Sequence, residues 1–132
     1  MQTAGISLPC RVAAAAVIIG ALLAGTALGQ SASPEYQRKL LRLSEVLGAA
    51  HYLNRLCGGQ SDQLWRNQMV RLLNAESPSP PRRAEMVNRF NRGFQSYQQS
   101  FLKCSPAAAI ARKRFFREGA LLAQSLSRDR TQ

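Results

Sequence analysis

Three short breaks divide the chain after residue 33 into four segments, and they constrain the fold more than any other feature. Paired glycines at 58 and 59 favour a helix end, the SPSPP run at 77–81 interrupts any helix, and Ser105-Pro106 is typical of a helix start. Apolar residues within the segments recur at helical spacing, and no segment alternates with period two. We therefore expect an all-α fold with helices over about residues 34–57, 62–75, 81–104 and 106–126.

The short connections predict a small four-helix bundle in up-down-up-down order, or two packed helical hairpins. In the up-down order the first and third helices run parallel, so their C-terminal ends meet at one pole. Cys57 ends the first segment and Cys104 ends the third, each on an apolar stripe. We expect a Cys57–Cys104 disulfide, which would stabilise the fold by about 4 kcal/mol in the chain-entropy model.

Residues 1–29 have the layout of a secretory signal peptide. Arg11 precedes an uncharged, mostly apolar run, and small residues stand at Ala27 and Gly29. We expect cleavage after Gly29, a periplasmic location and no stable membrane span after cleavage. The alternative is a retained membrane anchor, for which the apolar run is short. Residues 30–126 would then form the helical domain, and residues 127–132 a polar tail that frays.

His51 and Cys57 are residue types found in thiol active sites and metal sites. Six residues apart on a helix, they point about 120° away from each other, and a disulfide would remove the thiolate. Together with Cys104 they lack the spacing of a zinc site, and no CxxCH motif for haem attachment occurs. We expect no catalytic residue, no metal and no cofactor, with His51 at the edge of the core.

Two carboxylates could support a different chemistry. Glu45 and Glu118 both lie within apolar helical segments, and a pair of acids about 5–10 Å apart can hydrolyse a glycosidic bond. The alternative is that each acid pairs with an arginine, as Arg114 could with Glu118 one turn later. We favour ion pairing, because the sequence does not define the distance between the two acids.

The basic charge is the broadest signal, with a formal net charge of +11 at pH 7. Clustered cations could bind nucleic acid, but an exported protein meets other anions, such as lipid headgroups, wall polymers and acidic proteins. A solvated surface without a partner explains the charge equally well. The basic candidates for partner binding are Arg89, Arg92, Arg112, Lys113 and Arg117.

A second stripe of the first segment lies away from its main apolar face and consists of Leu41, Gly48, Tyr52 and Leu56. Either the first helix is central and contacts two neighbours, or this stripe is exposed and binds a partner. A glycine inside a helix costs about 1 kcal/mol, which close packing would explain. We favour internal packing and keep the stripe as a partner-binding candidate.

The successive stretches EVLGAAHYLNRLC, LWRNQM, RFNRGFQSYQQSFLKC and FFREGALLA resemble a family of small exported alphaproteobacterial proteins of unknown function. The resemblance covers nearly all of the expected mature chain. It implies export and a shared helical domain with this cysteine pair, and it implies no activity. Phe94 stands where the family often has tyrosine. The motif positions are occupied by Glu45, Gly48, His51, Tyr52, Cys57, Trp65, Asn91, Arg92, Gly93, Cys104, Glu118 and Gly119.

Taken together, these patterns predict a non-enzymatic periplasmic binding or adaptor protein that acts in cell-envelope assembly or maintenance. Its expected partner is an envelope protein or an anionic envelope polymer. The alternative is a small cell-wall glycan hydrolase that uses Glu45 or Glu118.

Overall fold

The computed structural model describes residues 32–58 and 63–131, and the predicted signal peptide and its cleavage site lie outside this part of the chain. The described residues form helices and contain no strand, so the all-α prediction is confirmed. The four helices in this part of the chain are α1 (Pro34–Leu56), α2 (Leu64–Glu76), α3 (Pro80–Ser100) and α4 (Pro106–Arg130).

Serine caps and first-turn prolines start two of the helices. The Oγ atoms of Ser33 and Ser105 accept hydrogen bonds from the backbone N–H groups of Tyr36 (3.1 Å) and Ala108 (3.2 Å), and a proline follows each serine. Such caps satisfy N–H groups that have no partner within the helix. The predicted cap at Ser105 is therefore confirmed, whereas the expected start of the second helix at Asp62 falls outside the described residues.

Two helix ends differ from the prediction. α3 ends at Ser100 rather than Cys104, because Phe101 takes an extended conformation with φ −132° and ψ 108°. The tail from Ser127 was expected to fray, but α4 continues through Arg130. Lys39 on α1 binds Asp129 at 2.9 Å, which holds this last turn against the bundle.

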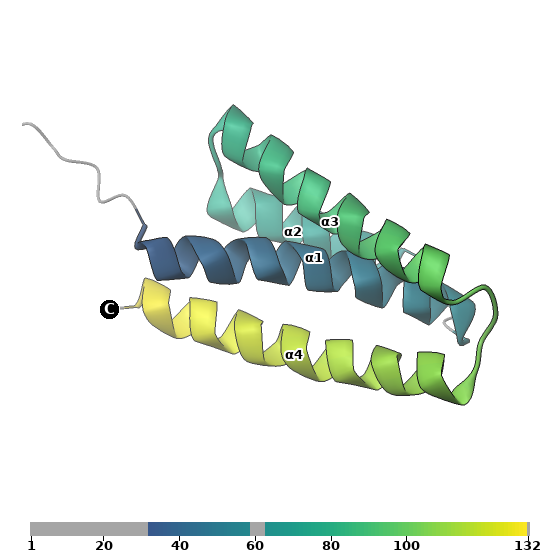
Figure 1. Ribbon diagram of the computed structural model, residues 1–132. Helices are drawn as coiled ribbons and strands as arrows, with labels where there is room; N and C mark the ends of the chain where they lie inside the picture. The colour runs from purple at the N-terminus through teal and green to yellow at the C-terminus, as the bar shows by residue number, and fades with distance from the viewer. Residues whose placement is uncertain (1–31, 59–62, 132) are drawn as a thin grey trace, which may run out of the picture. The chain divides into compact units, whose positions relative to one another are not determined.

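α1 lies at the centre of the arrangement. It packs against each of the other three helices (Figure 1). The backbones of the described parts of α2, α3 and α4 make few close approaches to one another, and these helices meet through side chains such as Trp65 and Phe116.

α3 runs parallel to α1, because Gly48 lies beside Phe90 and the later Cys57 is bonded to the later Cys104. α4 runs antiparallel to α1, because Arg42 binds Glu118 whereas the later Cys57 accepts a hydrogen bond from the earlier Arg112. This is the up-down-up-down order, with the C-terminal ends of α1 and α3 at one pole.

The core follows from this central position. From Val46 to His51 every residue of α1 is buried, as expected for a helix with neighbours on several sides. One apolar cluster surrounds Leu40, Leu73 and Met86, and a second surrounds Leu53 and Phe115. Over the described residues, no helix has the length and apolar character that a bilayer crossing requires.

Candidate functional site

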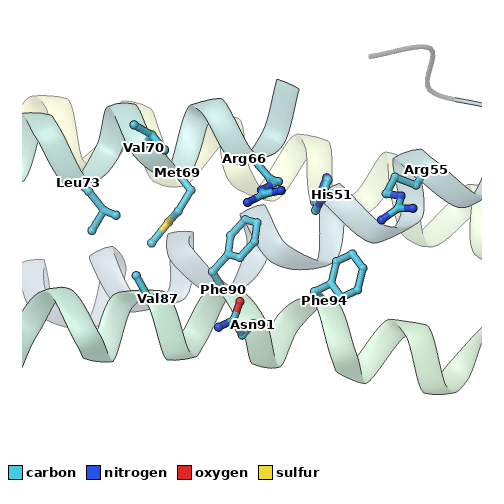
Figure 2. Close-up of a pocket in the computed structure, with 10 residues that line it drawn as sticks. All are labelled: His51, Arg55, Arg66, Met69, Val70, Leu73, Val87, Phe90, Asn91 and Phe94. Atoms are coloured by element: carbon cyan, nitrogen blue, oxygen red, sulfur yellow. The ribbon is translucent and has the colours of Figure 1, made fainter. Parts of the chain in front are cut away.

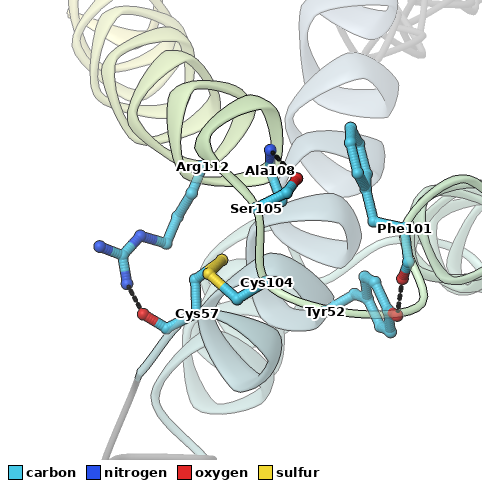
Figure 3. Close-up of a disulfide and its surroundings, with 7 residues drawn as sticks. All are labelled: Tyr52, Cys57, Phe101, Cys104, Ser105, Ala108 and Arg112. Carbon is cyan, nitrogen blue, oxygen red and sulfur yellow. Dashed lines mark hydrogen bonds between the residues drawn. A yellow bond between two sulfur atoms is a disulfide. The ribbon is translucent and has the colours of Figure 1, made fainter.

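The disulfide joins the end of α1 to the connection between α3 and α4. The Cys57 and Cys104 sulfurs are 2.08 Å apart, and their Cα atoms are separated by 5.0 Å, as predicted for this pair (Figure 3). The Tyr52 hydroxyl donates a hydrogen bond to the Phe101 carbonyl, and Arg112 Nη1 donates one to the Cys57 carbonyl at 2.9 Å. These contacts fix residues 101–105 and the start of α4 to the end of α1.

His51 lies between helices rather than beside Cys57 as a reactive pair. Only 5% of its surface is exposed, and its ring centroid is 6.0 Å from that of Phe90 and 5.4 Å from that of Phe94. Cys57 is oxidised and offers no thiolate. Within the described ranges, no group of three His, Cys, Asp or Glu side chains could hold a metal ion. His51 is therefore part of the contact between α1 and α3.

Two glycines bring the backbones of α1 and α3 into direct contact. A Cβ atom on Gly48 would lie 1.9 Å from the Phe90 carbonyl oxygen, and one on Gly93 would lie 2.1 Å from the Glu45 carbonyl oxygen. No side chain fits at either position without moving a backbone. Gly119 on α4 is less confined, since its Cβ would stand 3.3 Å from a Val46 methyl carbon.

The second stripe of α1 faces its neighbours. Gly48 is buried, whereas Leu41, Tyr52 and Leu56 are half-buried and pack against the two apolar clusters. The Tyr52 ring meets Phe94 edge-on, with 5.3 Å between ring centroids. These positions agree with internal packing of a central helix, and a role of the stripe in partner binding stays a prediction.

Glu45 and Glu118 are brought together on one arginine. Arg42 Nε lies 2.7 Å from a Glu118 carboxylate oxygen, and Arg42 Nη1 lies 3.3 Å from Glu45, which Arg89 also approaches at 3.7 Å. The hydrogen bond to Glu118 is the main reason that the pKa of Arg42 is raised above its ordinary value. Both acids pair with arginine, as favoured above.

The partner of Glu118 differs from the one proposed from the sequence. Arg114 was the candidate, but its guanidinium lies over the Phe115 ring, 5.5 Å from the centroid. Arg42 takes its place, because the antiparallel packing of α4 on α1 sets that residue beside Glu118. A partner this far away in the chain leaves no signal in local spacing.

The five basic candidates fall into two groups. Arg89 and Arg112 are partly buried and engaged, the first with Glu45 and the second with the Cys57 carbonyl and the Phe116 ring at 5.9 Å. Arg92, Lys113 and Arg117 are exposed. The structure therefore presents only these last three of the candidates freely to solvent.

Every acidic residue in the described part of the chain takes part in an ion pair. The pairs lie near the middle of the bundle or toward the pole where α1 begins. They are Glu35 and Asp129 with Lys39, Glu45 and Glu118 with Arg42, Glu76 with Arg130, and Glu85 with Arg82. These carboxylates pair with cations of their own helix or of a neighbouring one, so they do not offset the exposed cations elsewhere.

Three helices meet in a polar cluster at the pole where α1 begins. The Tyr36 hydroxyl donates to the Glu76 carboxylate at 2.8 Å, and Arg130 donates to both partners. Burial is the largest cause that raises the pKa of Tyr36 above its ordinary value, so the neutral phenol is favoured. This end of the bundle is closed by paired charges.

The pole at the disulfide has exposed cations in place of paired charges. No acidic residue occurs between Glu45 and Asp62 or between Glu85 and Glu118. The fold gathers these stretches at one pole, because the ends of α1 and α3 meet the starts of α2 and α4 there. Asp62 lies outside the described residues. We call five of the cations at this end the basic pole: Arg66, Lys103, Arg112, Lys113 and Arg114.

An apolar pocket of about 400 Å³ opens between α2 and α3 over the side of α1. Met69 on α2 and Phe90 on α3 point toward one another across it, and His51 and Phe94 lie alongside (Figure 2). Arg66 stands at its edge and belongs to the basic pole as well. A similar apolar recess of about 420 Å³ separates α2 from α4. Both lie beside α1 between outer helices whose backbones make few close approaches to each other.

The model of DUF2385, a family of proteins of unknown function, matches residues 35–129 of the chain. The chain belongs to this family. The matched range includes the disulfide, the Gly48–Gly93 contact and the basic pole of the DUF2385 domain. No curated protein and no solved structure matches the chain.

Several features of the DUF2385 domain were missed by the sequence analysis. It singled out Arg112 and Lys113 but not Arg66, Lys103 or Arg114, which share their pole. The long acid-free stretches were a usable signal, since the predicted parallel order of the first and third helices already brings them together. The apolar pocket depends on how far the outer helices stand apart, for which the sequence gives no measure.

Proposed function

We propose that the DUF2385 domain is a non-enzymatic binding or adaptor module of the cell envelope, exported to the periplasm with cleavage after Gly29. Its partner is an anionic envelope component, recognised through charge. The observation that carries the proposal is the distribution of charge. The described carboxylates are all engaged in ion pairs, while Lys103, Lys113 and Arg114 at the disulfide end are exposed and form no ion pair with a described acidic residue.

Physical chemistry links this distribution to binding. Cations without acidic neighbours create a positive potential that concentrates anions and orients their approach. Near an anionic surface each Lys or Arg contributes about 1 kcal/mol, roughly a fivefold gain in affinity. The disulfide, the Tyr52–Phe101 hydrogen bond and the Ser105 cap hold this end in one conformation, so binding would require little ordering of the chain.

Salt tests the proposal directly. We expect the purified protein to bind immobilised polyphosphate and to lose affinity steeply as the salt concentration rises, since screening shortens to about 8 Å at physiological ionic strength. The double substitution Lys103→Gln and Lys113→Gln should weaken binding about 25-fold. Titration by surface plasmon resonance measures both effects.

Two arginines at the other end of the bundle supply the matched control. Arg83→Gln with Arg128→Gln removes the same charge from exposed positions on α3 and α4, and it should change affinity much less. Equal losses of affinity in the two double variants would show that binding depends on net charge and not on the position of the cations. An affinity that does not change with salt would contradict the proposal.

The proposed export and cleavage can be tested separately from binding. If the leader is removed as proposed, N-terminal sequencing of protein recovered from the periplasm should begin at Gln30. A sequence that begins near Met1, or recovery with the membrane pellet under alkaline extraction, would instead indicate a retained anchor.

The glycan hydrolase alternative is supported less well. A general acid and a nucleophile or base must both be available to the sugar, whereas Arg42 lies between Glu45 and Glu118 and bonds to both. We therefore propose that these carboxylates hold α1, α3 and α4 together, and that wall glycan is not cleaved by this domain.

A further inference from the structure

The connection between α3 and α4 presents an apolar side chain to solvent. Leu102 is 88% exposed, the most exposed of the large apolar residues that the structure describes, and Ile110 on the second turn of α4 follows at 69%. Lys103 adjoins Leu102, and Lys113 and Arg114 follow Ile110 along α4. We call Leu102, Lys103, Ile110, Lys113 and Arg114 the docking tip.

Leu102 is held outward by a fixed backbone. The residue before it accepts the Tyr52 hydrogen bond, Cys104 is covalently joined to Cys57, and Ser105 caps α4 (Figure 3). The Phe101 side chain is half-buried and stacks on Tyr97, 6.3 Å between centroids. The chain therefore places the aromatic residue inward and the adjacent leucine outward at the extreme end of the bundle.

The outward side of α4 continues the same surface. The buried residues Ala108 and Phe115 define the inward side, and Ile110 and Lys113 are more than 120° around the helix from Phe115. Both are exposed. The first turns of α4 therefore display an aliphatic side chain beside cations, with no acidic residue before Glu118.

Apolar and cationic groups on one surface, with no acidic residue among its described members, match the chemistry of a bilayer interface. Lysine and arginine bind headgroup phosphates, and a protruding leucine gains free energy by entering the acyl boundary. A soluble polyanion would use the cations but would leave Leu102 in water. An acidic protein could cover Leu102 only with an apolar pocket placed beside its carboxylates, whereas a bilayer interface offers apolar and anionic groups over its whole surface. Charge complementarity and the position of Leu102 thus select a lipid surface among the possible anionic partners.

We propose that the docking tip binds an anionic phospholipid bilayer, with Leu102 inserted between the lipids and Lys103, Lys113 and Arg114 bound to phosphates. This inference rests on the proposed function for its electrostatic part and adds the class of partner. Binding of this kind is peripheral and reversible, because one leucine and a few cations give modest membrane affinity.

Vesicle binding tests the proposal. The full-length protein should co-sediment with vesicles of phosphatidylglycerol and phosphatidylcholine and should not co-sediment with phosphatidylcholine alone. Leu102→Ser should weaken binding about tenfold, as expected when one leucine no longer leaves water. Leu121→Ser is the matched control, since Leu121 is also exposed on α4, at 59%, but lies outside the docking tip.

A second readout reports insertion itself. In Leu102→Trp the added indole should shift its emission to shorter wavelength when phosphatidylglycerol vesicles are added, whereas in Leu121→Trp the emission should stay unchanged. Thermal unfolding of each variant should match that of the wild type, because both leucines make few contacts with the bundle.

The outcomes separate this inference from the proposed function. Vesicle binding that is indifferent to Leu102→Ser, or equally sensitive to Leu121→Ser, would overturn insertion and leave recognition by charge in place. Binding to polyphosphate without binding to vesicles would also overturn the lipid proposal alone. Binding to neither probe would overturn both proposals.

Discussion

Gly48 and Gly93 decide how closely α1 and α3 approach. Each glycine lies against a carbonyl oxygen of the opposite helix, so the two backbones meet without intervening side chains. The sequence indicated close packing at Gly48, because a glycine inside a helix needs compensation. It did not indicate Gly93 as the partner position, since helical periodicity defines the face of each helix but not the register between two of them.

Alanine substitutions at Gly48, which lies against a backbone, and at Gly119, which lies against a side chain, test the packing of α1. Gly48→Ala should destabilise the fold by at least about 1–3 kcal/mol, because its Cβ would lie 1.9 Å from the Phe90 carbonyl oxygen and must push the backbones apart. Gly119→Ala should be nearly neutral, since a contact of 3.3 Å with a methyl group can relax while alanine favours the helix. Urea unfolding measures both changes.

The difference in unfolding free energy between the two variants tests the close approach of α1 and α3. If Gly48→Ala were as stable as Gly119→Ala, the close approach of α1 and α3 would be wrong.

At the scale of helices and their connections, local sequence signals predicted most of the structure. The Ser105-Pro106 helix start, the proline-rich break and the meeting of Cys57 and Cys104 at one pole were all predicted from the sequence. The helix ends were less accurate. α3 stops before the cysteine because Tyr52, on another helix, binds the Phe101 carbonyl, and such a tertiary contact leaves no local trace.

The disulfide should contribute strongly to stability. Its cysteines are 47 residues apart in the chain, so replacing both with serine should cost about 4 kcal/mol through the greater entropy of the unfolded state. Denaturant titration of Cys57→Ser/Cys104→Ser against the oxidised wild type measures this difference.

Reduction of the wild type supplies the control for the disulfide, because it opens the same bond without a change of sequence. We expect dithiothreitol to lower the unfolding midpoint of the wild type and to leave that of the double variant in place. Equal midpoints for the oxidised and reduced wild type would contradict the assigned contribution.

Considered as a whole, the domain keeps its described carboxylates away from the disulfide pole. The pole where α1 begins is closed by pairs such as Glu76–Arg130 and Asp129–Lys39, and the disulfide pole has exposed cations. The positions of acidic residues in the sequence, combined with the predicted topology, were sufficient to infer this separation. The individual ion pairs were not, because Arg42 and Glu118 meet only through packing of α1 on α4.

The central position of α1 has a consequence for the order in which the molecule can assemble. Among the four described helices α1 is synthesised first, yet its stretch from Val46 to His51 is buried by helices that follow it in the chain. Until α4 has been made, part of that apolar surface has no cover, and the nascent chain is open to aggregation. Conversely, a fragment that lacks α1 would keep side-chain contacts such as Trp65 with Phe116, but it would lose the helix that contributes to both apolar clusters. α1 thus provides the surface against which α2, α3 and α4 pack.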